Sequence, residues 1–115
     1  MTDFWYARPV FFVSDIHRAL TFYADVLQFT KKWHTEEGKG KVAQVDHGEC
    51  EIILCEDSSR TDRSRLFIEL KPEVFAALGR DYAARGVPTK STRWGYDVLE
   101  VDDPDGNELY FPDPT

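Results

Sequence analysis

The 115-residue chain has only two cysteines and no apolar run near the roughly 20 residues that a membrane-spanning helix needs. Its N-terminus also lacks the basic-then-apolar pattern of a secretory signal, so we expect a cytoplasmic protein that does not bind a membrane. Cys50 and Cys55 lie five positions apart in one predicted strand. Their side chains then point to opposite faces of that strand, and we expect no disulfide between them.

Basic residues are also scarce: 14 Lys and Arg stand against 21 Asp and Glu, a formal net charge of −7. Phosphate contacts require clustered basic side chains, so the balance disfavours nucleic acid as a partner. An acidic protein attracts cationic ligands through its overall field, although the same charge also serves solubility.

Apolar residues make up 42% of the chain, enough for the core of one domain over residues 1–115. We expect module one at about 5–57, a polar linker at 58–64 and module two at 65–115. Module one reads as a strand at 10–13, a helix at 16–27 with apolar residues on one face, and strands at 30–35, 41–46 and 50–56 around the polar turn 36–40. Module two reads as a strand at 66–70, a helix from Pro72 to Gly86, and strands at 87–90, 97–102 and 108–112.

Each half therefore has the order β-α-β-β-β, with equivalent positions about 58 residues apart, which indicates a repeat of architecture. The last two strands flank Asp103-Pro104-Asp105-Gly106-Asn107. Proline fixes φ in such a turn and glycine tolerates a positive φ, so the segment predicts a tight hairpin.

Three segments together resemble the glyoxalase/bleomycin-resistance/extradiol-dioxygenase superfamily, also called vicinal oxygen chelate proteins. They are residues 9–15 with 20–29, the Arg85-Gly86-Val87 helix exit, and the Asp103–Asn107 turn. The resemblance implies an α+β fold of two tandem βαβββ modules, whose strands form a cup-shaped mixed sheet with the helices outside. Gln28 stands where the family usually has glycine, which argues against a left-handed cap there.

Enzymes of this superfamily hold a divalent metal through His and Glu side chains from four strands. The family pattern places Arg8, Ile53, Arg65 and Tyr110 at those positions. Arginine and isoleucine offer no ligand to a divalent ion, and a single tyrosine does not make a site. A two-residue slip would bring Glu108, which shares a face with Tyr110, to the ligand position, still without three partners. We therefore predict no metal and no other cofactor.

The histidines do not supply a replacement site. We expect His17 to be solvated on the first helix, and His34 and His47 to meet across the module-one hairpin as a surface pair. No third ligand is spaced to join them.

The predicted ligand site combines aromatic and acidic side chains that strand alternation places on the cup-facing side, together with two tryptophans in a hairpin and a loop. For the aromatic members, the alternative interpretation is that they fill the core or cover its edge. The predicted ligand-binding residues are Phe12, Trp33, Ile53, Arg65, Phe67, Glu69, Trp94, Glu100 and Tyr110. We predict no catalytic residue.

The resemblance and the missing ligands favour a metal-free protein that sequesters a cationic, bleomycin-type glycopeptide. Two alternatives stay open. One is a binder of another small metabolite, and the other is an enzyme in which Glu51 or Glu69 acts as general base while Tyr110 and an arginine hold the substrate.

Trp5 and Tyr6 precede the first strand, and in the family this arm often reaches a partner subunit, so we expect a homodimer.

Overall fold

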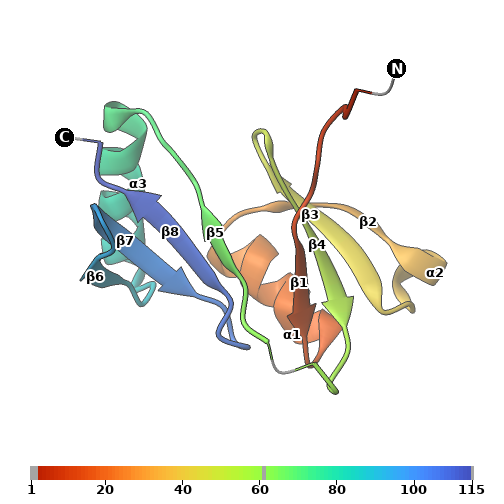
Figure 1. Ribbon diagram of the computed structural model, residues 1–115. Coiled ribbons are helices and arrows are strands. Elements are labelled where there is room, and N and C mark those ends of the chain that lie inside the picture. The colour runs from red at the N-terminus through yellow and green to blue at the C-terminus, as the bar shows by residue number, and fades with distance from the viewer. Residues whose placement is uncertain (1–2, 61, 115) are drawn as a thin grey trace. The chain divides into compact units, whose positions relative to one another are not determined.

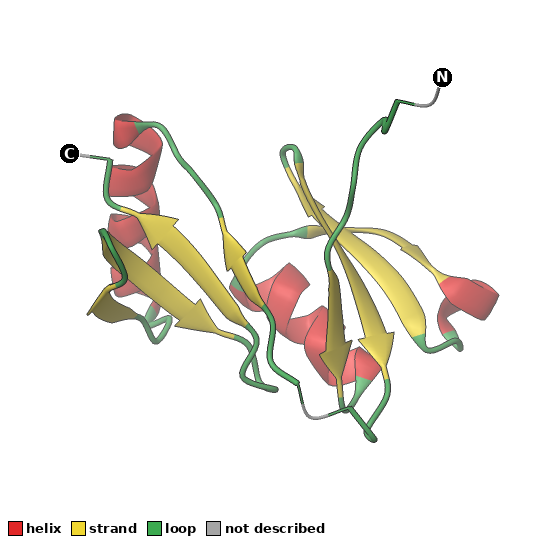
Figure 2. Cartoon of the chain, viewed as in Figure 1, coloured by secondary structure: helices red, strands yellow, loops and turns green. Residues whose placement is uncertain are grey.

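The computed structural model describes residues 3–60 and 62–114, and the chain divides into two compact units, Met1–Asp62 and Arg63–Thr115. Each unit contains a four-stranded mixed sheet with a helix (Figures 1 and 2). The predicted α+β architecture of two βαβββ modules is therefore confirmed. The single domain over residues 1–115 and the shared cup remain predictions, and Thr61 of the predicted linker lies outside the described residues.

Unit one follows the predicted order closely. Its elements are β1 (Val10–Val13), α1 (Ile16–Thr21), a π-helical turn η1 (Phe22–Val26), β2 (Thr30–His34), the short α2 (Thr35–Gly38), β3 (Val42–His47) and β4 (Cys50–Glu56). The strand order is β1-β4-β3-β2, with β1 parallel to β4 and the other pairs antiparallel. Alternate strand residues such as Phe11, Ile52 and Leu54 are buried on the side where α1 contacts β3 and β4.

Unit two comprises β5 (Arg65–Phe67), α3 (Pro72–Arg85), β6 (Lys90–Arg93), β7 (Asp97–Asp102) and β8 (Glu108–Pro112), in the order β5-β8-β7-β6. The predicted strand at 87–90 was wrong, because β6 begins at Lys90. The amide of Val87 is used to close the end of α3 on the Tyr82 carbonyl, at 2.9 Å, and Pro88 has no N–H to donate to a sheet. β5 is also shorter than the predicted 66–70.

The predicted polar turn at 36–40 contains the short α2, which departs from regular helix geometry. Glu36 and Glu37 both have positive φ, at 50° and 53°. Gly40 follows this turn so closely that a Cβ there would lie within 3 Å of Thr35 side-chain atoms.

Among the described residues, none of the helices combines the length and the apolar character that crossing a bilayer requires.

The α1–η1 segment begins at a side-chain cap and ends at an unusual residue. The Asp15 carboxylate accepts hydrogen bonds from the amides of His17 and Arg18, at 2.9 and 3.1 Å, which lowers the pKa of Asp15. At the far end, Gln28 has a φ of +64°. The expectation that glutamine prevents a left-handed cap was therefore wrong. The amide of Phe29 reaches back to the Tyr23 carbonyl at 2.8 Å and holds this conformation.

Replacing Gln28 by glycine is expected to stabilise the protein by about 0.5–1 kcal/mol, because glycine adopts a positive φ without a Cβ penalty. Gln28 is exposed, so little packing is lost. Urea unfolding of Gln28→Gly beside Gln28→Ala measures the effect. A glycine variant no more stable than the alanine variant would show that this cap carries no strain.

The Asp103–Asn107 turn is a buried polar structure as well as a hairpin. The Asp103 carboxylate accepts hydrogen bonds from the amides of Asp105 and Asn107, both at 2.9 Å, and from the Asn107 side chain at 3.0 Å. Gly106 supplies the positive φ of +85°. The Asn107 side-chain oxygen accepts from the Ser64 amide at 2.9 Å. The turn therefore also fixes the start of β5.

Candidate functional site

Each sheet has an open face, which we define as the face opposite its helix. In unit two this face carries alternate residues of β5, β8 and β7, and the register places Phe67 beside Tyr110 and Tyr110 beside Glu100. Arg65 lies next to Glu108 in the same register. Four predicted ligand-binding residues thus share one surface, as strand alternation requires.

Four rings on and beside this face form an aromatic cluster, consisting of Phe67, Trp94, Tyr96 and Tyr110. The ring centroids of Phe67 lie 5.7 Å from Trp94 and 5.8 Å from Tyr96, and Trp94 lies 5.7 Å from Tyr110. These separations are typical of interacting aromatic pairs. Trp94 is 48% exposed and Tyr96 is 59% exposed, whereas Tyr110 is buried. The cluster therefore presents two aromatic rings to solvent, backed by the half-buried Phe67 and the buried Tyr110.

Arg65 connects the aromatic cluster to the charged part of the face. Its guanidinium lies 4.3 Å from the ring centroid of Tyr110 and 5.3 Å from that of Trp94. It also forms an ion pair with Glu108 at 2.9 Å. The guanidinium lies over both rings while it donates to the Glu108 carboxylate, which fixes its orientation.

Three carboxylates stand beside the cluster. This acidic triad consists of Glu100, Asp102 and Glu108, and one ligand atom of each lies within 4.8 Å of the others. Lys90 lies 2.8 Å from Asp102 and 3.6 Å from Glu100. The pKa of Glu100 is raised, first by its hydrogen bond to Asp102 and then by burial. Burial opposes ionisation of Asp102 as well, but hydrogen bonds from Glu100 and Lys90 outweigh it and lower the pKa of Asp102.

Replacing Glu100 by glutamine is expected to stabilise the protein at pH 8. Because the pKa of Glu100 is raised in the folded state, the protonated carboxyl favours folding and the ionised carboxylate opposes it. The favourable contribution of the protonated form is lost as pH rises through that pKa. Glutamine keeps a donor toward Asp102 without the charge. Unfolding midpoints at pH 4 and pH 8 measure the effect, and we expect the advantage of Glu100→Gln to shrink at pH 4. An advantage equal at both pH values would contradict the assignment.

The donor set does not suit a divalent metal of the family type. At the family positions, Arg65 is paired with Glu108, and Tyr110 has its pKa raised by burial, followed by the nearby carboxylates. In unit one, Ile53 has no donor atom and Arg8 donates to Gln44 at 2.7 Å. The acidic triad has oxygen ligands, but they are already paired with Lys90 and Arg65. We therefore derive no chemistry through a metal.

The open face of unit one is organised around Gln44, which is 1% exposed. Its side-chain oxygen accepts from Arg8 at 2.7 Å and from the Trp33 indole at 3.1 Å. Its amide nitrogen donates to Asp46 and Glu51, both at 2.8 Å. This Gln44 network holds one guanidinium, one indole ring and two carboxylates in fixed positions. Sequence reasoning named Trp33 but missed Gln44, although Gln44 is a polar residue between the apolar Ala43 and Val45.

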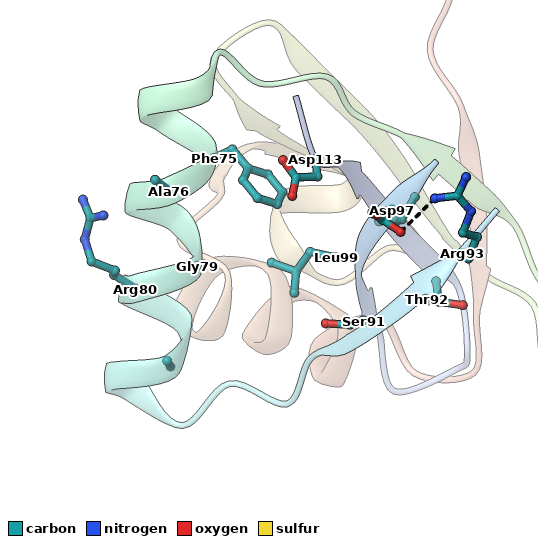
Figure 3. A pocket seen from close by; sticks show the side chains of 12 residues that line it. Phe75, Ala76, Gly79, Arg80, Ser91, Thr92, Arg93, Asp97, Leu99 and Asp113 are labelled. Atoms are coloured by element: carbon teal, nitrogen blue, oxygen red, sulfur yellow. Dashed lines mark hydrogen bonds and ion pairs between the residues drawn. The ribbon is translucent and has the colours of Figure 1, made fainter. Parts of the chain in front are cut away.

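Two hollows lie away from the predicted ligand-binding residues. The larger, about 830 Å³, opens between α3 and the β6–β7 hairpin and is lined by Phe75, Gly79 and Leu99 with Arg80 and Arg93 (Figure 3). Tyr82 is the one fully buried side chain of α3, and Val74 on the same helix is 46% exposed. A smaller hollow of about 420 Å³ is lined by residues of the arm and of β2 to β4: Tyr6, Ala7, Lys32, Asp46, Gly48, Glu49 and Glu51.

The remaining predicted residues have diverse surroundings. Phe12 pairs in register with Cys55, and the Arg60 guanidinium lies 4.1 Å from its ring centroid. Ile53 is half-buried between β1 and β3. Glu69 lies just beyond the end of β5 and is exposed, outside the aromatic cluster. Conversely, Tyr96 belongs to the cluster although the sequence did not single it out.

The histidine pairing differs from the prediction. His34 pairs with Ala43 in register and contacts His17, with ring centroids 5.6 Å apart. His47 instead contacts Phe29 at 5.3 Å. A bulge between Lys31 and Trp33 shifts the register of β2 and turns His34 toward the helix side of the sheet.

Known structures resemble the whole chain. A bleomycin-binding protein from bleomycin-producing Streptomyces verticillus, complexed with copper(II)-bleomycin, is 23% identical, with a TM-score of 0.74 and full coverage of both chains. A fosfomycin resistance protein from Listeria monocytogenes is 15% identical (TM-score 0.74, covering 99% of this chain and 94% of that one). A lactoylglutathione lyase from Agrobacterium tumefaciens is 17% identical (TM-score 0.70, covering 93% and 92%).

At these identities the likeness establishes the fold alone, and a search among curated proteins found no match. The sequence profile of one family matches residues 5–111, which is nearly the whole chain. The matched range includes both βαβββ units, the aromatic cluster and the Asp103–Asn107 turn. The chain belongs to the Glyoxalase/Bleomycin resistance protein/Dioxygenase superfamily.

Proposed function

We propose that the protein is a metal-free binding protein that sequesters a cationic small molecule with planar heteroaromatic rings, of the bleomycin type. The observation that carries this proposal is the aromatic cluster, in which Trp94 and Tyr96 are about half exposed beside Phe67. Rigid aromatic rings stack on planar ligands at small entropic cost. Single exposed aromatic residues are common on protein surfaces, but packed groups of this kind are typical of binding sites.

Charge supports the cationic part of the ligand. The chain carries a formal net charge of −7, which raises the local concentration of cations. On the open face of unit one, the Gln44 network fixes Asp46 and Glu51 as acceptors. The bleomycin-binding protein from Streptomyces verticillus, similar over its full length, was solved with copper(II)-bleomycin, which makes that antibiotic the first ligand to test.

Binding alone would be sufficient for this function. Several charged groups on the open faces are already paired with protein partners: Arg65 with Glu108, Lys90 with Asp102, and Glu51 with Gln44. Resistance by sequestration requires one protein site for each ligand molecule and no turnover, so it depends on affinity and on the amount of protein.

Equilibrium dialysis against metal-free and copper(II)-loaded bleomycin tests the proposal. We expect saturable uptake of one ligand per chain, with the ligand recovered at unchanged mass. Absence of uptake for both forms would refute antibiotic binding and leave another small metabolite as the ligand to be sought. Recovery of a chemically altered ligand would refute the purely binding role.

An enzymatic role is the second candidate, and the raised pKa of Glu100 next to the buried Tyr110 is the observation that favours it. Glu100 lies on the open face beside the aromatic cluster. Of the two bases expected from sequence, Glu51 is hydrogen-bonded to Gln44 and Glu69 lies outside the cluster. Turnover of a substrate that is lost in Glu100→Gln would support this alternative. Retained turnover in that variant would exclude Glu100 as the base.

The N-terminal arm supports a proposed homodimer. Phe4 is 96% exposed and Trp5 is 90% exposed, an unusual exposure for consecutive aromatic residues. Replacing Trp5 by serine is expected to weaken dimerisation by at least about tenfold, because buried aromatic anchors dominate interface energies. Sedimentation equilibrium measures the dissociation constant. Val74→Ser removes another exposed apolar side chain and serves as the control; an equal effect of both changes would contradict a role of the arm.

A further inference from the structure

On the helix side of the first sheet, opposite its open face, two histidines come together from different elements. His17 lies in the first turn of α1 and His34 is the last residue of β2, at the edge of the sheet. Their ring centroids are 5.6 Å apart, with the rings inclined at 62°. Two imidazoles that share one metal ion, with nitrogen–metal bonds near 2 Å, place their centroids roughly 5–6 Å apart. The pair therefore already has the spacing of a metal-bound pair.

The His34 ring is oriented by a hydrogen bond of the kind that metal-binding histidines make. Its Nε2 lies 2.7 Å from the Gly40 carbonyl oxygen, and because a carbonyl only accepts, Nε2 carries the proton. The neutral ring then has its lone pair on Nδ1. Metal-ligating histidines usually donate their other ring N–H to a carbonyl or carboxylate, which fixes the tautomer and the ring plane.

The Gly40 carbonyl is itself held by local structure. The Gly40 amide donates to the Thr35 carbonyl at 3.0 Å, and the Thr35 hydroxyl donates to the Val42 carbonyl at 3.0 Å. Gly40 is buried, and a side chain at this position would collide with Thr35. The acceptor that orients His34 therefore belongs to a tight turn.

The surroundings of His17 are compatible with a bound cation. His17 is exposed at the N-terminal end of α1, and its backbone amide donates to the Asp15 carboxylate at 2.9 Å. The Asp15 carboxylate therefore lies at the same end of α1 as His17. Water can approach the exposed ring and complete the coordination sphere of an ion.

We propose that His17 and His34 form a two-histidine site for a divalent transition metal ion that favours imidazole, such as Ni²⁺ or Zn²⁺, with water in the remaining positions. Imidazole nitrogen suits these ions, and exposed sites that have few protein ligands keep bound water. An ion at this site would link α1 to the edge strand β2. Because it would bind the folded state only, it would also stabilise that state.

Ni²⁺ alone is the probe, since it is paramagnetic and the chain has only three histidines. In proton NMR spectra, we expect the imidazole signals of His17 and His34 to broaden at low Ni²⁺ while that of His47 stays sharp. His47 is the internal control, because it stands four positions along β3 from the Ala43 partner of His34, roughly 13 Å away. Equal broadening of all three signals, or none, would overturn the proposal.

Calorimetry with Ni²⁺ gives the second test. We expect one ion per chain, and at least about tenfold weaker binding in His17→Ala and in His34→Ala. His47→Ala is the matched control and should bind as the unaltered protein does. His17 is exposed, so its alanine variant keeps the fold even if His34→Ala does not. Undiminished binding by His17→Ala would show that the two rings form only an edge-to-face contact.

Discussion

Replacing Trp94 by alanine is expected to weaken ligand binding about 10- to 100-fold. The stacking of a planar ring on an aromatic side chain is worth about 1–3 kcal/mol by alanine substitution. Trp94 is the member of the aromatic cluster that contacts Phe67, Tyr110 and the Arg65 guanidinium, and half of its surface is exposed. Calorimetric titration with metal-free bleomycin measures the loss, without relying on the fluorescence of the replaced residue.

The control for this variant is Val74→Ala, which removes exposed apolar surface from α3 in the same unit. We expect it to bind like the unaltered protein. Tyr110→Ala is a less informative variant, because Tyr110 is buried and its loss also disturbs the core. Unchanged affinity of Trp94→Ala would place the ligand elsewhere and contradict the assigned site.

Replacing Asp103 by alanine is expected to destabilise the protein by about 3 kcal/mol. Asp103 is 4% exposed, and its carboxylate accepts three hydrogen bonds within the turn. Each buried donor that loses its partner costs about 1–3 kcal/mol. One of these donors is the side chain of Asn107, which holds the Ser64 amide at the start of β5, so the effect extends beyond the hairpin.

Urea unfolding measures this loss, and Asp97→Ala is a suitable control. Asp97 forms an exposed ion pair with Arg93 at 3.1 Å, and exposed pairs of this kind contribute about 0–1 kcal/mol. A loss in Asp103→Ala no larger than that in Asp97→Ala would show that the turn does not anchor unit two.

The order of the elements could be predicted because the apolar periodicity changes clearly between helix and strand. The helix that starts at Pro72 ends at Gly86, whose φ of +71° closes it as predicted. The errors have local causes. Pro88 excludes the predicted strand at 87–90, and backbone hydrogen bonds force Gln28 into a conformation that its side chain does not favour.

The candidate site was only partly predictable, for reasons of register. Alternation placed Phe67 and Tyr110 each on the cup-facing side of its own strand, and the register of the sheet brings the two side by side. It could not reveal the bulge in β2, which decides the face on which His34 lies. Nor could it show that the amide of Trp94 donates to the carbonyl of Tyr96 at 2.9 Å, a turn that brings the Tyr96 ring to Phe67.

Gln44 shows a different limit of sequence reasoning. Its side-chain oxygen accepts from Arg8, which lies 36 positions earlier in the chain. Its side-chain nitrogen donates to Glu51 across the β3–β4 hairpin. A polar residue between two apolar strand residues indicates a buried hydrogen bond, but the partners depend on the register of three strands. Only the assembled sheet identifies them.

A titration of tryptophan fluorescence with metal-free bleomycin tests ligand binding at the aromatic cluster most directly. Trp94 lies in the aromatic cluster, so we predict saturable quenching at one ligand per chain, most of which disappears in Trp94→Phe. A flat titration, or quenching that Trp94→Phe leaves intact, would contradict ligand binding at the aromatic cluster.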